Sequence, residues 1–126
     1  MITMTQEDKK LLLKDLSARL LYGVKGIITY DKSNTTFTVK GIDNNVLHLS
    51  DAEDCYVEDF KPYLRPMSSM TEEEKEEYQA FFNYDGVEYP EEYIDWLIDH
   101  HFDHRGLIKK GLAIEAPEGM YNLKEQ

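Results

Sequence analysis

The chain changes its hydrophobic period between residues 60 and 82, and this change limits the folds that it can form. Pro62 and Pro66 each lack a backbone donor and favour an extended path over the first part of this stretch. Thr71 and Glu74 then form a capping box, in which the hydroxyl accepts from the amide three residues on and the carboxylate reaches back. The stretch therefore predicts an extended segment followed at once by a helix.

The predicted helix is acidic at its start and aromatic on one face. Three consecutive glutamates from Glu72 occupy the first turn, where exposed backbone amides favour negative charge. Tyr78, Phe81 and Phe82 share one face at helical spacing, so the helix has a surface with which to dock. We expect the extended segment and the helix to act together as a strap that joins both parts of the chain into one core.

The N-terminal part of the chain predicts a helix over residues 6–21. Thr5 and Asp8 resemble a capping pair, and leucines at positions 13, 16 and 20 repeat at helical spacing. Gly23 can end this helix in the left-handed conformation that other residues resist.

From residue 24 the hydrophobic period becomes two, which is the period of β-strands. The runs VKGIITYD, TTFTVKG and VLHLS are rich in β-branched and aromatic residues and are separated by short polar turns. Because the connections are too short for parallel crossovers, the runs predict an antiparallel meander. A fourth strand is expected at residues 55–57. The pattern leaves open whether the sheet closes into an SH3-like barrel, with the first helix over one face or an open end.

The C-terminal part predicts further helix and an irregular tail. Pro90 can occupy the first position of a helix over residues 91–101, in which Ile94, Leu97 and Ile98 form an apolar stripe. One further helical turn is expected at residues 107–110. The fold class is therefore α+β: a helix, three to four antiparallel strands, then two to three helices. We expect one domain over residues 1–126, with the helix and sheet in 1–59 and the acidic helical segment in 60–126.

The net charge of −11 is concentrated in the second part of the chain. Residues 1–50 carry 7 Lys/Arg and 5 Asp/Glu, whereas residues 51–126 carry 7 and 20. This acidity disfavours direct contact with nucleic-acid phosphates or anionic membranes and suits a basic protein partner. Glutamates in a first helical turn have a local structural reason. The acidic residues expected to bind a partner are therefore those beyond such turns or on the last helix: Glu76, Glu77, Glu91, Glu92 and Asp95.

The single cysteine, Cys55, indicates a reduced compartment, because it has no partner for an internal disulfide. Nearby acids, Asp54, Glu58 and Asp59, would raise the pKa of its thiol, so we expect a half-buried strand residue and no nucleophile. No stretch approaches the length of about 20 apolar residues that spans a bilayer, and the N-terminus lacks the apolar core of a signal peptide. A soluble cytoplasmic protein is expected.

The cluster DHHFDH at residues 99–104 is the strongest candidate for metal binding. His100 and His104 would share one face if the helix continued, with Asp99 and Asp103 as further ligands. The competing interpretation is that the imidazoles interact with exposed carbonyls at a helix end. No third ligand stands at a recognisable spacing and no catalytic motif occurs elsewhere, so we expect no cofactor and no catalytic residue.

Aromatic residues in the predicted sheet suggest one further alternative. Tyr30, Phe37, Tyr56 and Tyr63 could stack single-stranded bases. Such platforms normally lie in a basic groove, and only the first part of the chain, with Lys25, Lys32 and Lys40, approaches one. Packing in a core or an interface is the commoner role of such residues.

Three blocks carry a resemblance to a known group of proteins. They are DLSARLLYGV at 15–24, KPYLRPMSSMTEEE at 61–74 and DWLIDHHFDHRGLIKKGLAIEAPEGMYN at 95–122. Together they resemble a group of small proteins from gut bacteria and their phages or mobile elements. The resemblance implies no known activity. In similar sequences we expect Pro in place of Leu21 and often Tyr in place of His104, which weakens the metal hypothesis.

The sequence therefore favours a non-enzymatic intracellular module that binds another protein. Three alternatives stay open. The chain could be an acidic DNA mimic that occupies a basic nucleic-acid-binding protein, a single-strand-binding protein that uses its sheet, or a metal-dependent enzyme that uses His100 and His104.

Overall fold

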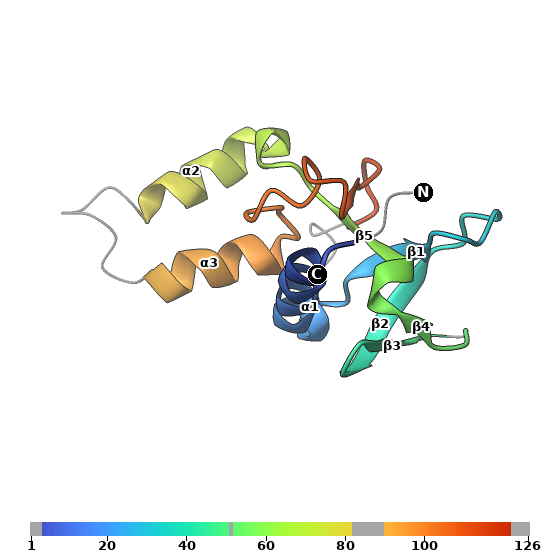
Figure 1. The fold of residues 1–126 in the computed structure, drawn as a ribbon. Coiled ribbons are helices and arrows are strands. Elements are labelled where there is room, and N and C mark those ends of the chain that lie inside the picture. Colours follow the sequence, from blue (N-terminus) through green and yellow to red (C-terminus); the bar gives the residue numbers. More distant parts are fainter. Residues whose placement is uncertain (1–3, 51, 82–89, 122–126) are drawn as a thin grey trace.

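The computed structural model describes residues 4–50, 52–81 and 90–121 (Figure 1). In this part of the chain an N-terminal helix is followed by a sheet, and two further helices precede the last short strand. The elements are α1 (Gln6–Arg19), β1 (Lys25–Ile28), β2 (Phe37–Asp43), β3 (Val46–Leu49), β4 (Cys55–Tyr56), β5 (Phe60–Leu64), α2 (Glu72–Ala80), α3 (Pro90–Asp99) and β6 (Ile114–Glu115).

The first helix begins and ends where its sequence indicates. The Asp8 amide donates to the Thr5 hydroxyl at 3.0 Å, a single 3₁₀ turn, Leu20–Tyr22, follows α1, and Gly23 has a left-handed φ of 72°. The buried face differs from the predicted one, because it contains Leu12 together with Leu16, whereas Leu13 and Leu20 are only half-buried. The buried stripe is therefore rotated about the helix axis relative to the predicted stripe.

The meander of β1 to β4 is antiparallel, as predicted, but the sheet is larger and stays open. Its strand order is β4-β3-β2-β1-β5-β6, which gives six strands in place of the expected three to four. β4 contains two residues and, in the described part of the chain, pairs with β3 alone, and the chain then turns through the 3₁₀ turn Val57–Asp59. The sheet consequently does not close, and the suggested SH3-like barrel is not formed.

Of the two additional strands, β5 forms in the segment that was predicted to be extended, and β6 forms in the tail that was predicted to be irregular. β5 pairs with β1 in antiparallel register, and Phe60, Pro62 and Leu64 alternate inward. β6 lies parallel to β5. Gly26 of β1 allows β1 and β5 to lie close together. A methyl group at this position would overlap the Phe60 ring and the Lys61 carbonyl.

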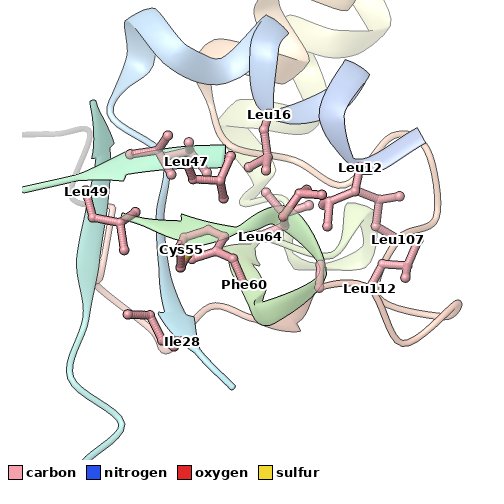
Figure 2. Packing of buried hydrophobic residues seen from close by; sticks show 14 residues of the cluster. Leu12, Leu16, Ile28, Leu47, Leu49, Cys55, Phe60, Leu64, Leu107 and Leu112 are labelled. Carbon is pink, nitrogen blue, oxygen red and sulfur yellow. The ribbon is translucent and has the colours of Figure 1, made fainter. Parts of the chain in front are cut away.

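One apolar core lies between α1 and the sheet and is closed by the segment after α3. Figure 2 shows side chains of α1, of the strands and of this C-terminal segment converging around Phe60. Phe60 and Leu64 of β5 are fully buried at its centre. The extended part of the predicted strap therefore contributes to this core, whereas no residue of α2 is among its members. The labelled members of the core are Leu12, Leu16, Ile28, Leu47, Leu49, Cys55, Phe60, Leu64, Leu107 and Leu112.

The two predicted C-terminal helices are confirmed and the extra helical turn is not. α2 and α3 lie side by side at the end of the molecule opposite β4 (Figure 1), with Tyr78 of α2 next to Trp96 of α3. Residues 107–110 form turns and no helix. Phe82, predicted for the docking face of α2, lies outside the described residues. Among the helices of the described ranges, none has the length and apolar character to cross a membrane.

Candidate functional site

A buried ion-pair cluster fixes the segment that follows α3 against α1. Asp15 and Arg19, one helical turn apart, are both fully buried, and the Arg19 Nε lies 2.7 Å from Asp15 Oδ2. Arg19 Nη2 donates to the Phe102 carbonyl at 2.6 Å, and Arg105 Nε donates to Asp15 Oδ1 at 3.2 Å. Because buried charges are tolerated only when paired and hydrogen-bonded, this cluster specifies one position for residues 102–105.

Arg65, just after β5, holds the same segment from the other side. Its backbone amide donates to the His101 carbonyl, and its carbonyl accepts from the Asp103 amide, both at 2.8 Å. Its guanidinium carbon lies 4.2 Å from the centre of the Phe102 ring, which is within range of a cation–π interaction. Phe102 is therefore held in the interior between Arg19, which binds its carbonyl, and Arg65, which covers its ring.

Glu74 couples α2 to this framework. The predicted capping box is present, since the Glu74 amide donates to Thr71 Oγ1 at 3.1 Å and the Thr71 amide donates to Glu74 Oε1 at 2.9 Å. The same carboxylate receives both terminal nitrogens of Arg65, at 2.6 and 2.8 Å. The arginine and the capping bond hold the pKa of Glu74 below its usual value, against the effect of burial.

Aromatic side chains join α2 to α3. Tyr78 and Phe81 of α2 approach Trp96 of α3 with ring centroids 5.9 and 6.4 Å apart. Trp96 also stacks on His100 at 4.2 Å, and its indole nitrogen donates to Glu77 Oε2 at 3.2 Å. The α2 helix has no fully buried residue, so these rings and Glu74 provide the contacts that attach it.

A cleft of about 1000 Å³ lies between the start of α2 and the loop at residues 115–121. Arg65, His100 and Tyr121 line it, and five carboxylates come from two distant parts of the chain: Glu73, Glu74, Glu77, Glu115 and Glu118. Arg65 neutralises Glu74, and Glu77 is engaged by Trp96. No ion pair is found for Glu73, Glu115 or Glu118 among the described residues. The cleft therefore carries an excess of negative charge.

Of the residues predicted to bind a partner, only Glu77 lines this cleft. Glu76, Glu92 and Asp95 are exposed on α2 and α3 outside it, and the side chain of Glu91 lies outside the described part. Glu115 and Glu118 were not predicted, because they lie 40 residues or more from Glu74 in sequence. The available signal was their place in the AIEAPEGMY stretch, whose acidic residues have no helix start to explain them.

The predicted metal ligands are separated by the end of α3. The helix stops at Asp99 and His101 has a left-handed φ of 65°, so His100 and His104 do not share a helical face and the premise of that prediction is wrong. The Asp103 oxygens accept from the backbone amides of Leu107 and Ile108 at 2.8 and 2.9 Å. Asp99 is exposed. Within the described ranges no group of three or more His, Cys, Asp or Glu side chains could hold a metal ion.

His101 is buried and His104 is half-buried, and the surroundings of both rings favour the neutral imidazole. His101 stacks on Tyr121 with ring centroids 3.7 Å apart, and burial together with nearby Arg19 and Arg65 lowers the pKa of His101 to about 4. Burial and the neighbouring Arg19 also lower the pKa of His104, whose Nδ1 lies 3.5 Å from Arg19 Nη2. The positive charge of this interior therefore favours packing roles for both rings.

Cys55 lies in a strand, β4, as predicted, but it is buried and not half-buried, with 5% of its surface exposed. Burial, followed by Asp59 and Asp54, raises the pKa of its thiol to about 11. A thiol with this pKa is protonated at neutral pH and is a poor nucleophile.

The four aromatic residues predicted to stack bases differ in their exposure to solvent. Tyr30 and Tyr56 are largely exposed, whereas Phe37 and Tyr63 are half-buried. The two exposed rings line a second cleft together with Asp54 and Asp59. These carboxylates disfavour the phosphates of a nucleic acid.

The sequence analysis did not identify the Asp15–Arg19 pair, because charged residues of a helix normally lie on its solvated face. An (i, i+4) pair in register with Leu12 and Leu16 was the signal that could have placed it inside. Together the observations define the protein as a small open-sheet α+β domain with an acidic cleft. Comparisons with protein-family models, curated proteins and solved structures give no match.

Proposed function

We propose that the chain is a non-enzymatic interaction module that binds a basic segment of a partner protein in the cleft between α2 and residues 115–121. The observation that carries this proposal is the convergence of Glu73, Glu115 and Glu118 on one cleft without matching cations in the described residues. Such a surface attracts Lys and Arg side chains and raises the rate of encounter with a basic partner.

Two residues that line the cleft, Arg65 and Glu74, support selective binding, because they are held in place. The Arg65–Glu74 pair is mostly buried and also anchors the start of α2, so the carboxylates around it need no large rearrangement before binding. Exposed ion pairs each contribute only about 0.2–1 kcal/mol, so several must act together. We therefore expect modest affinity for any single cation and marked dependence on salt.

The direct test is a titration with a fluorescent octalysine peptide, compared between two triple variants. One is Glu73→Gln/Glu115→Gln/Glu118→Gln in the cleft. The other is the matched control Glu7→Gln/Asp43→Asn/Glu53→Gln, whose three acids are exposed elsewhere. Both variants change the net charge equally. We expect the cleft variant to bind at least tenfold more weakly and the control variant to bind nearly as the parent does.

Salt dependence completes this test. Binding to the parent should weaken steeply from about 0.05 to 0.5 M salt, because the distance over which exposed charges are screened falls from about 14 Å to about 4 Å over this range. Equal weakening in both triple variants would show a general charge effect and would contradict binding in the cleft.

A second candidate function is DNA mimicry, which the exposed acids of α2 and α3 favour. Glu72, Glu76, Glu92, Asp95 and Asp99 are exposed on these neighbouring helices. The resemblance to proteins of phages and mobile elements supports the same candidate. Mimicry predicts that a nucleic-acid-binding protein captured by this chain loses its DNA when the complex forms. Gel-shift competition tests this, and a ternary complex with DNA would contradict it.

A further inference from the structure

A second, smaller cleft lies at the edge of the sheet, away from the acidic cleft. Its volume is about 360 Å³, and its lining comes from the turn after β1, from β3, and from β4 with its flanks: Tyr30, Val46, Asp54, Cys55, Tyr56 and Asp59. Figure 1 places β4 and α2 at opposite ends of the molecule. The two clefts are therefore separate surfaces.

The tyrosines of this edge cleft are exposed to an extent that core packing does not explain. Tyr30 is 66% exposed and Tyr56 is 59% exposed, although 26 residues separate them in sequence. No aromatic contact or hydrogen bond of either side chain is found among the described residues. Exposed tyrosines that gather on one hollow are typical of binding surfaces, because a rigid ring provides contact area at a low entropic cost.

The charged groups of the edge cleft are acidic. Asp54 pairs with the half-exposed His48 at 2.9 Å, whereas no ion pair of Asp59 is found in the described ranges. Among the described residues, no Lys or Arg lines the cleft. Burial and these two aspartates raise the pKa of Cys55, which reports the same negative field. The occupant should therefore offer a cation that can also lie against an aromatic ring.

We propose that the edge cleft binds an arginine side chain of an extended peptide, with the guanidinium group against Tyr30 or Tyr56 and paired with Asp59. Arginine fits these groups better than lysine, because its planar guanidinium stacks on aromatic rings and pairs with a carboxylate through two parallel hydrogen bonds. β4 stands at the end of the strand order, and an edge strand is where the backbone of an extended peptide can pair with a sheet.

The test is an NMR titration of the full chain with the peptide acetyl-Gly-Arg-Gly-amide, compared with the same peptide containing citrulline. Citrulline keeps the shape of arginine and removes its charge. We expect saturable shifts at Tyr30, Tyr56 and Asp59 with the arginine peptide only, and at least tenfold weaker binding there in Asp59→Asn and Tyr56→Ala. The matched controls are Asp43→Asn and Tyr22→Ala, exposed residues outside the cleft, which should bind as the parent does.

Other outcomes would overturn the inference in distinguishable ways. Equal shifts with the citrulline peptide would exclude recognition of the cation. Shifts confined to His100 and Tyr121 would place the arginine in the acidic cleft, which agrees with the proposed function and contradicts this site. Unchanged affinity in Asp59→Asn, with a spectrum that confirms its fold, would remove the carboxylate from the interaction.

Discussion

At the scale of single residues, the buried pair Asp15–Arg19 contributes more to the choice of fold than to raw stability. Removing a charge from water is costly, and attraction to its partner offsets that cost only when geometry and hydrogen bonding are good. Here Asp15 accepts from both Arg19 and Arg105, and Arg19 reaches the Phe102 carbonyl. The pair thus favours one placement of the C-terminal segment over other apolar arrangements.

This interpretation predicts a strong interaction between substitutions of the two residues. Arg19→Met leaves Asp15 buried with only Arg105, and should lower the free energy of unfolding by about 3–5 kcal/mol. The double variant Asp15→Leu/Arg19→Met removes both buried charges and should recover to within about 1–2 kcal/mol of the parent. Urea denaturation followed through the single tryptophan, Trp96, measures both. The prediction would be contradicted if the double variant lost as much stability as Arg19→Met and Asp15→Leu lose when their separate effects are added.

His101 predicts a loss of stability in weak acid. The histidine pKa is about 6.5 in an unfolded chain and about 4 here, so the unfolded state binds the additional proton between these values. Stability is therefore fully present above pH 6.5 and should fall by about 3 kcal/mol as pH falls toward 4. Urea midpoints at half-unit steps of pH measure this, and His101→Gln should flatten the slope. An unchanged slope in that variant would assign the effect to other groups.

At the scale of elements, α2 depends on one carboxylate for its position. The helix buries no residue fully, and Glu74 both closes the capping box and receives Arg65. Its start is therefore fixed by polar contacts, while its end is held by rings packed against Trp96. Such an element is expected to open locally before the core unfolds.

Glu74 variants separate the two roles of this side chain. Glu74→Gln can keep a capping box but loses the charged pair, whereas Glu74→Ala loses both and should cost about 2 kcal/mol, with the Gln variant intermediate. We expect faster hydrogen exchange at α2 amides and altered Trp96 fluorescence, with β1 and β5 amides changed little. Glu72→Ala, an exposed neighbour without these roles, is the control. Equal exchange in both alanine variants would contradict the anchor.

The elements with local signals were predictable from sequence, and those that depend on partners distant in sequence were not. Thr71 and Glu74 mark a helix start through bonds three residues apart, so the beginning of α2 was predicted. β6 exists only because β5 lies beside it, and its two residues carry no periodicity. The acidic cleft combines α2 with residues 115–118 in the same nonlocal way. Its acidity was predictable from composition, but its lining was not.

At the scale of the whole molecule, Tyr121 joins three separate parts of the chain. Its hydroxyl accepts from the Lys25 amide of β1 at 2.9 Å and donates to the Tyr63 carbonyl of β5 at 2.8 Å, while its ring stacks on His101. It also lines the acidic cleft. The C-terminal segment is therefore part of the same folded unit as the sheet. The side of the acidic cleft that this segment forms is held in place by these contacts of Tyr121.

Tyr121 accordingly predicts a loss of stability in alkali. Burial raises the pKa of its hydroxyl to about 12, against 10 in an unfolded chain, so the unfolded state releases its proton first as pH rises. Stability should fall by about 3 kcal/mol between pH 10 and 12. Tyr121→Phe keeps the stacked ring but leaves the Lys25 amide and the Tyr63 carbonyl without this partner, so it should be less stable at pH 7 by about 1–3 kcal/mol and should lack the alkaline component. Chemical denaturation across this range measures both effects, with the exposed Tyr22→Phe as control. If Tyr121→Phe retained the full alkaline loss, a group other than the Tyr121 hydroxyl would cause it.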